Sequence, residues 1–109
     1  MATTFKTLEL GSIAAGSYAE GEWTPDRDIT IKKVVANERT GASLNAVECY
    51  ISIADVPYTK EIVPLSTIGT NIEYCWKPDL KVPKGSKIYV KCSNTGSSDV
   101  NVDIVFEYE

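Results

Sequence analysis

The sequence predicts an all-β fold, an antiparallel, eight-stranded, jelly-roll-like β-sandwich. Apolar and polar residues alternate along most of the chain, which is the period of a strand with one buried face. Glycine and proline interrupt these runs at intervals of roughly 8–12 residues, as in sandwiches and barrels. Two short motifs also occur twice. The 109 residues correspond to a single domain, 1–109.

Each expected strand follows from its alternation. The clearest is 100–108, in which every second residue is apolar up to the C-terminal end. Similar rows predict strands at 29–37, 47–53 and 88–92, with weaker ones at 5–10, 18–23, 58–63 and 72–76. The neighbours Val34 and Val35 predict a bulge or a change of buried face. Residues 94–98 are expected to close a hairpin between the last two strands.

The repeated motifs favour two pseudo-symmetric halves. Trp-x-Pro-Asp occupies 23–26 and 76–79, and Thr-Gly-x-Ser occupies 40–43 and 95–98. We interpret Trp23 and Trp76 as equivalent residues of the structural core, and the proline–aspartate turns as equivalent corners. The alternative is convergent turn chemistry, because proline and aspartate suit the same turn positions in unrelated segments.

Composition limits the partners. The net charge of -4 and the pI near 4.8 oppose binding to polyanions, so no nucleic acid is expected. No segment approaches the roughly 18 consecutive apolar residues of a membrane span. Residues 1–7 lack the apolar stretch of a secretory signal, so no export signal is expected.

The absence of histidine limits the chemistry. Histidine is the usual general base and the commonest transition-metal ligand, so we expect no enzyme, no metal site and no cofactor. Carboxylate pairs that could serve glycoside hydrolysis are Glu20 with Glu22, Asp26 with Asp28, and Glu107 with Glu109. We favour solvated surface charge for all three. Asp26 and Asp28 could also ligate calcium, but a salt-bridged turn around Arg27 is favoured.

The three cysteines do not define a disulfide framework, because they are odd in number and widely spaced. Free thiols are favoured over one bridge plus one thiol. Cys49 and Cys92 fall on the apolar phase of their strands and are expected in the core. Cys75 is expected nearer the surface.

Charge is uneven near the C-terminus. Lysines cluster from 77 to 91, and carboxylates follow from 99 to 109. One interpretation is a basic face for an acidic partner. We favour pairing across the expected hairpin, with Lys87 and Lys91 opposite Asp103 and Glu107.

Outward tyrosines are the strongest candidates for binding. Tyr50 and Tyr89 fall on the outward phase of their strands, and Tyr74 is a further candidate. Such rings suit protein contacts or sugar stacking, or they cover lysine stems. The first strand, 5–10, is expected to lie exposed and to add to a neighbour's sheet edge. The predicted contact residues are Phe5, Leu8, Leu10, Tyr50 and Tyr89.

The segment 80–90 carries a resemblance to known proteins. Pro83-Lys84-Gly85-Ser86-Lys87-Ile88-Tyr89-Val90 gives the pattern Pro-x-Gly-x-x-Ile-x-Val, and Asn94-Thr95-Gly96 and the last strand follow. This resembles the closing half of small jelly-roll domains in carbohydrate-binding modules and in capsid decoration (cement) proteins of phages and archaeal viruses.

The resemblance to the virion group implies a non-enzymatic structural protein, assembled into a virion in the host cytoplasm. Its partners would be further copies of itself, as a homo-oligomer, or a larger capsid protein. The alternative is an extracellular carbohydrate-binding or adhesin-like module, with a sugar as ligand. The resemblance assigns no site residue.

Overall fold

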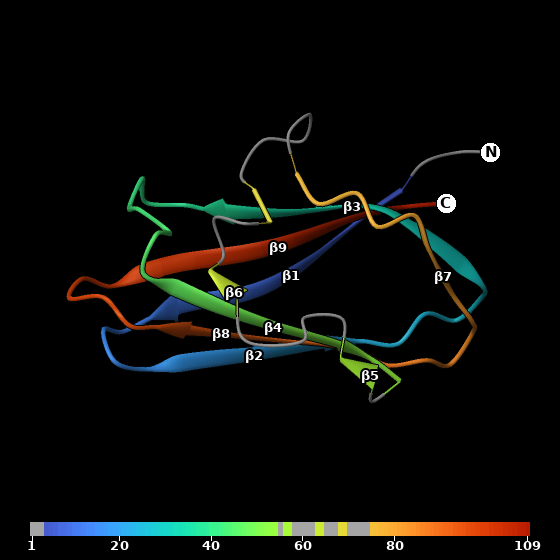
Figure 1. Ribbon diagram of the computed structural model, residues 1–109, viewed down its shortest axis with the longest axis horizontal. Coiled ribbons are helices and arrows are strands. Elements are labelled where there is room, and N and C mark those ends of the chain that lie inside the picture. The colour runs from blue at the N-terminus through green and yellow to red at the C-terminus, as the bar shows by residue number, and fades with distance from the viewer. Residues whose placement is uncertain (1–3, 55, 58–62, 65–67, 70–74) are drawn as a thin grey trace.

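A computed structural model shows two antiparallel β-sheets compatible with a β-sandwich (Figure 1). It describes residues 4–54, 56–57, 63–64, 68–69 and 75–109. Within these residues there are seven strands of three or more residues, two strands of two residues and no helix. The all-β prediction is therefore confirmed.

Sheet A has the strand order β1-β9-β3-β7, so β1 and β7 are its edges. Its strands are β1 (Thr4–Ile13), β3 (Ile29–Glu38), β7 (Leu80–Val82) and β9 (Val100–Tyr108). Sheet B has the order β2-β8-β4-β5, and β6 also pairs with β4. Its strands are β2 (Tyr18–Trp23), β4 (Val47–Ile53), β5 (Val56–Pro57), β6 (Val63–Pro64) and β8 (Ile88–Asn94). Apart from β4, β5 and β6, which all belong to sheet B, consecutive strands thus alternate between the two sheets.

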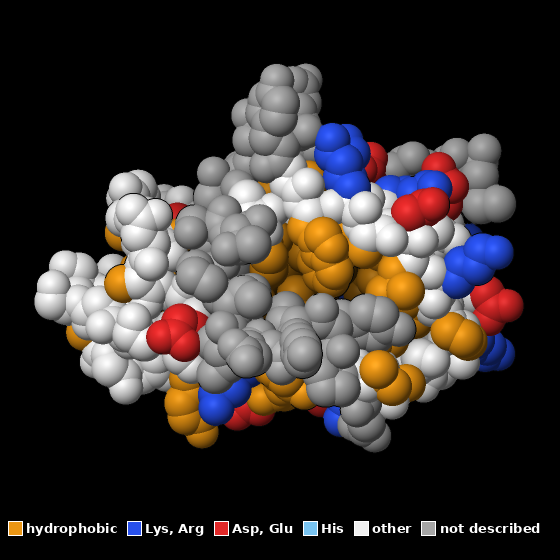
Figure 2. Space-filling view, viewed as in Figure 1, with side chains coloured by type: hydrophobic (Ala, Val, Ile, Leu, Met, Phe, Trp, Pro, Cys, Tyr) orange, Lys and Arg blue, Asp and Glu red, His pale blue; other side chains and the backbone are white. Residues whose placement is uncertain are grey.

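The core forms between the sheets from the apolar phase of each strand. In β8 every second residue is buried, as the alternation predicts, and the same holds for the apolar residues of β9 from Val100 to Phe106. The largest side chains with almost no exposure include Phe106, Ile31, Ile51, Ile88 and Ile104. Apolar side chains also reach the surface in the centre of the face shown in Figure 2. Burial of these two apolar faces is what holds sheet A against sheet B.

Two register shifts change which residues face inward. In β1 the pairing with β9 shifts between Glu9 and Gly11, and Gly11 has a φ of 76°. In β3 the pairing with β9 shifts between Ile31 and Lys33. Before the second shift the buried residues of β3 are odd-numbered and end at Ile31, and after it they are even-numbered and begin at Val34. The change of buried face expected at Val34 and Val35 therefore begins three residues earlier, at Ile31.

Three of the strand predictions, two from strong alternation and one from weak alternation, are accurate to the residue. Residues 18–23, 47–53 and 100–108 form strands with the predicted bounds. Most of the predicted strand 58–63 and residues 72–74 of the predicted strand 72–76 lie outside the described residues. The prediction missed β7, because three residues beside prolines give no periodic signal.

The predicted hairpin between the last two strands is wrong. β8 pairs with β2 and β4 in sheet B, whereas β9 pairs with β1 and β3 in sheet A. The pairing of Lys87 and Lys91 with Asp103 and Glu107 fails with it. A five-residue loop can close a hairpin or cross between sheets, and the choice depends on which long-range partners bury each strand.

The lysines and carboxylates have other partners instead. Lys87 Nζ lies 3.8 Å from Glu22 Oε2, and Lys91 Nζ lies 4.3 Å from the centre of the Tyr18 ring. On sheet A, Lys33 Nζ lies 3.7 Å from Glu107 Oε2. The charges are therefore paired within each sheet, on the two outer faces.

Only one of the two repeated motifs has equivalent places in the fold. The Thr-Gly-x-Ser copies both lie in loops that cross between the sheets, from β3 to β4 and from β8 to β9. These loops touch, since Thr95 N donates to Ala46 O over 2.9 Å. The other motif places its tryptophans differently.

Trp23 and Trp76 both pack against the core cluster while remaining partly exposed, but they are not equivalent. Trp23 ends β2, and its ring centre lies 5.0 Å from that of Tyr108 and 5.8 Å from that of Phe106. Trp76 precedes β7 and forms a single bridge to Val34 of β3. The proline–aspartate segment after Trp23 leads from sheet B to sheet A, whereas the one after Trp76 stays beside β3. The prediction of equivalent corners is therefore wrong.

Candidate functional site

The outer face of sheet B carries three tyrosines among charged residues, and we call it the tyrosine face. It is built from the outward residues of β2, β8 and β4, which lie in rows across the sheet because directly paired residues point to the same side. The rows are Glu22–Tyr89–Ser52, Glu20–Lys91–Tyr50 and Tyr18–Ser93–Glu48. Tyr50 and Tyr89, in neighbouring rows of the adjacent strands β4 and β8, stand diagonally, close enough for large side chains to touch.

Specific contacts fix the aromatic rings. The ring centres of Tyr50 and Tyr89 are 6.1 Å apart, in an edge-on arrangement with an interplanar angle of 63°. Tyr89 Oη donates to Glu20 Oε2 over 2.7 Å. The ammonium group of Lys91 lies over Tyr18, which is 58 % exposed. The tyrosine face is therefore preorganised before any partner arrives.

A shallow hollow opens on this face. It has a volume of about 300 Å³ and is lined by Tyr50, Ser52, Lys87 and Tyr89. Two phenol rings, the Ser52 hydroxyl and the Lys87 ammonium group surround it. Such a combination can stack against a flat ring and donate hydrogen bonds to its substituents.

Burial and the neighbouring carboxylate change the titration of Tyr89. Burial is the largest cause, followed by the hydrogen bond to Glu20 and the charge of that carboxylate, and together they raise the pKa of Tyr89 to about 12. Since the ordinary value is 10.0, the folded protein holds the phenolic proton longer than the unfolded chain does. The stability that neutral Tyr89 contributes is complete below pH 10 and is lost as the pH rises towards about 12.

Replacing Glu20 with glutamine will lower the pKa of Tyr89 towards its ordinary value, because the charge that opposes the phenolate is removed. Ultraviolet absorbance of tyrosinate during a pH titration measures this. The variant Tyr89→Phe identifies the transition, which disappears in that protein. An unchanged titration in Glu20→Gln would contradict the contact between Tyr89 and Glu20.

The predicted contact residues do not form one surface. Tyr50 and Tyr89 come together on sheet B, but Phe5 pairs with Glu107 and lies on the outer face of sheet A, 54 % exposed. Leu8 is only 7 % exposed and belongs to the core, so it is not available as a contact residue. Leu10 is half-buried against the same core. β1 is an edge strand of sheet A, which is the position that the predicted addition to a neighbour's sheet requires.

Sequence reasoning missed Tyr18 as part of the site. It shares the outward phase of Glu20 and Glu22, and this signal was present in the alternation of β2. Tyr74 lies outside the described residues.

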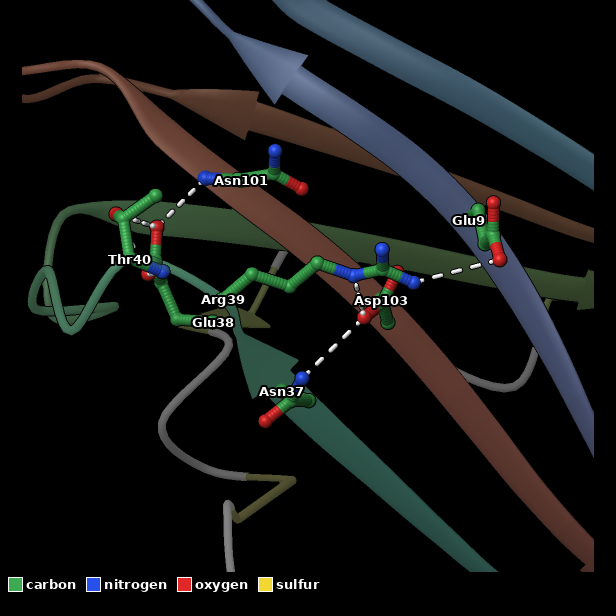
Figure 3. Close-up of polar contacts among 7 residues, drawn as sticks. All are labelled: Glu9, Asn37, Glu38, Arg39, Thr40, Asn101 and Asp103. Atoms are coloured by element: carbon green, nitrogen blue, oxygen red, sulfur yellow. Dashed lines mark hydrogen bonds and ion pairs between the residues drawn. The ribbon is translucent and has the colours of Figure 1, made fainter.

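A second polar cluster lies on the outer face of sheet A (Figure 3). Asp103, which is 4 % exposed, accepts hydrogen bonds from Arg39 Nε over 2.6 Å and from Asn37 Nδ2 over 3.2 Å. The other side of the Arg39 guanidinium lies 3.3 Å from Glu9 Oε1. Arg39 therefore bridges β1 and β9 from the end of β3, and its half-exposed guanidinium is already paired with two carboxylates of the same chain.

Glu38 holds the adjacent loop to β9. Its carboxylate accepts from Asn101 N over 2.6 Å, from Ala42 N over 3.2 Å, and from both the N–H and the hydroxyl of Thr40. Burial is the largest single influence and opposes the charge. The hydrogen bonds together outweigh it and lower the pKa of Glu38 to about 2. The residue acts as an anchor for its own loop.

The carboxylate pairs proposed for catalysis or calcium are engaged locally where the structure gives their partners. Glu20 accepts from Tyr89, and Asp28 Oδ1 accepts from Lys84 N over 2.8 Å. Gly85 N donates to Pro25 O over 3.0 Å, so the turns around 25–28 and 83–86 are joined. In the part of the chain that the structure describes, no group of three or more acidic, cysteine or histidine side chains is arranged to hold a metal ion.

A further hollow lies where the two Thr-Gly-x-Ser loops meet. It has a volume of about 370 Å³ and is lined mainly by small residues of both loops, including Ser43, Ser98 and Asn94. The amide of Asn94 is occupied, since Nδ2 donates to Ile13 O and Ser98 O while Oδ1 accepts from Gly96 N. The Asn94 amide is thus taken up by hydrogen bonds within the protein and is not available to a ligand in this hollow.

Comparisons with known proteins add no functional assignment. No protein-family model matches the chain, and no curated protein matches it. Among the residues placed by the structure, no helix has the length and apolar character needed to cross a membrane.

Proposed function

We propose that this protein is a non-enzymatic binding protein that acts through the tyrosine face of sheet B. The arrangement of Tyr18, Tyr50 and Tyr89 on that face carries the proposal. Tyrosine is enriched at protein contacts because it offers a large, rigid area with a polar tip and loses little conformational entropy. The fixed rings and the balanced flanking charges suit recognition without catalysis.

More specifically, we propose a small jelly-roll component of a virus particle that decorates or cements its shell. The strand order supports this fold. If β5 and β6, which both pair with β4, are counted as one strand, the eight strands follow the order 1-8-3-6 in sheet A and 2-7-4-5 in sheet B. Jelly rolls of this order build viral capsid proteins and lectins. The Pro-x-Gly-x-x-Ile-x-Val pattern is shared with carbohydrate-binding modules, whereas the short, fully β chain with free cysteines favours the capsid group.

In this function, the tyrosine face binds a further copy of the chain or a larger capsid protein. A specific interface needs about 1,000 Å² of buried surface or more. Repetition of the same contact on a lattice adds avidity, so each contact can be individually weak. The site of assembly would be the cytoplasm of the host.

The double variant Tyr50→Ala/Tyr89→Ala will weaken self-association or binding to particles at least tenfold, because aromatic anchors carry most of the binding energy of such contacts. Size-exclusion chromatography with light scattering measures self-association, and co-sedimentation measures binding to virus particles. Phe5→Ala is the matched comparison, since Phe5 is an exposed aromatic residue on the other sheet, and a loss of binding in that variant alone would move the contact to sheet A. A wild-type protein that stays strictly monomeric and binds no particle would contradict the proposal.

The hollow beside Tyr50 and Tyr89 favours a second candidate, a carbohydrate-binding or adhesin-like module acting outside the cell. A sugar ring stacked on either tyrosine would lie beside the hydroxyl of Ser52 and the ammonium group of Lys87. A glycan array separates the two candidates. Sugar binding that is lost in Tyr50→Ala and Lys87→Ala but kept in Phe5→Ala would favour the module, and no binding to any glycan would count against it.

A further inference from the structure

Two of the three cysteines face each other in the centre of sheet B. Cys49 of β4 is paired directly with Cys92 of β8, and both are fully buried. The strands β4 and β8 run side by side through the sheet (Figure 1). Both residues fall on the inward phase, so their side chains point to the same side. All three cysteines are thiols in this structure.

The hydrogen-bond pattern shows which kind of pair they form. At one end of the β4–β8 ladder Thr95 N donates to Ala46 O, and at the other Ala54 N donates to Lys87 O. Each bond joins two directly opposite residues. Because hydrogen-bonded and non-hydrogen-bonded pairs alternate along the ladder, the even-numbered residues of β4 form hydrogen-bonded pairs with β8. Cys49 and its partner are therefore a non-hydrogen-bonded pair, in which the Cα atoms are about 4.5 Å apart and the side chains are closer.

This spacing suits a disulfide. Bridged cysteines have Cα atoms about 4.4–6.8 Å apart, and the pair falls at the short end of that range. Contact with the Cys92 thiol, followed by burial, raises the pKa of the Cys49 thiol, which also indicates that the two sulfur atoms are neighbours.

We propose that Cys49 and Cys92 are an oxidation site and form a reversible disulfide that links β4 to β8 when the protein meets a disulfide oxidant. The inference does not depend on the proposed function. The bridge joins Cys49 to Cys92 of the same chain, and Cys75 takes no part in it.

Glutathione disulfide can serve as the oxidant. One cysteine thiolate attacks it, forms a mixed disulfide and releases one glutathione thiolate. The second cysteine thiolate then attacks the mixed disulfide, forms the bridge and releases the second glutathione. The two protein thiols lose two electrons, glutathione disulfide gains them, and the two protons end on the two glutathione thiols.

Two properties of the bridge follow from its place. Because the Cα separation lies within the range of bridged cysteines, the bridge can form without moving β4 away from β8. Because both thiols are buried and the pKa of Cys49 is raised, the folded protein reacts slowly, and exchange proceeds mainly when the chain opens. The bridge also joins the two strands that carry Tyr50 and Tyr89.

The test uses the full chain with Cys75→Ser, so that every thiol belongs to the pair. The variant is unfolded in urea and refolded in buffer with excess glutathione disulfide. We expect both thiols to be lost to a thiol reagent after denaturation, the intact mass to fall by two hydrogen atoms, and the chain to stay monomeric on a non-reducing gel. Dithiothreitol will restore both thiols.

The same protein refolded with dithiothreitol gives the reference for folding, measured by circular dichroism. A second variant, Cys75→Ser/Cys92→Ala, keeps a single thiol and cannot form the internal bridge. If Cys75→Ser refolds with both thiols reactive, or loses them only as glutathione adducts or intermolecular dimers, the proposal is overturned. In the wild-type chain refolded in the same way, peptide mapping that joins Cys75 to Cys49 or Cys92, in place of a bridge between 49 and 92, overturns it as well.

Discussion

Replacing Phe106 with alanine will lower the free energy of unfolding by about 3–5 kcal/mol. Phe106 is only 1 % exposed and lies in the middle of the core, with its ring centre 5.8 Å from that of Trp23. Truncation removes apolar contacts from both sheets and leaves a cavity that the strands cannot close without shifting. A loss of this size is a large fraction of the about 5–15 kcal/mol that stabilises a typical domain.

Urea unfolding followed by circular dichroism measures this loss. The chain contains one other phenylalanine, Phe5, which is 54 % exposed and provides the matched control. Phe5→Ala will change stability by no more than about 0.5 kcal/mol. If Phe106→Ala does not fold, Phe106→Leu gives a smaller cavity and a measurable intermediate loss. Equal effects at the two positions would contradict the assignment of Phe106 to the core.

Replacing Glu38 with alanine will cost about 1.5–3 kcal/mol at neutral pH, the range for hydrogen bonds to a charged group. The half-buried carboxylate collects donors from Thr40, Ala42 and Asn101, and alanine leaves these without their acceptor. The change detaches the loop after β3 from the start of β9. Urea unfolding at neutral pH measures the cost. Glu22→Gln, at a side chain that is 65 % exposed, is the control and will change little.

The contribution of Glu38 also depends on pH in a defined direction. Its pKa is lowered from 4.5 to about 2 in the folded protein, so the unfolded chain binds the proton first as the pH falls. The stabilisation is complete above the unfolded value and is lost as the pH falls through this window. The difference in stability between wild type and Glu38→Gln will therefore shrink between about pH 5 and pH 2. A difference that stays constant over this range would contradict the anchoring role.

Much of the candidate site was predictable, because outward positions follow from alternation. Tyr50 and Tyr89 lie on the outward phase, and Tyr18 could have been found by the same reasoning. Their contact was not predictable, since it depends on the register between β4 and β8. The assignment of Leu8 failed for a related reason. Even in an edge strand, the side chains on one face are buried. The bulge in β1 interrupts the alternation, so the sequence did not show which residues of this strand face the core.

The same limit applies to the cysteines. The inward phase of Cys49 and of Cys92 is a local property, and the sequence predicted it correctly. That they stand opposite each other at a non-hydrogen-bonded position is a property of two strands far apart in the chain. A shift of the register by one residue would move one thiol to the outer face.

The sequence by itself determined the all-β class, the bounds of several strands and, in the strands without a bulge, the face that is buried. These depend on the period of apolar residues, which is local. Only the tertiary structure decided that β8 and β9 belong to different sheets, that Trp23 and Trp76 are not equivalent, and that three tyrosines share one face. The reason is that pairing depends on which apolar faces can be buried together, and residues distant in sequence determine this.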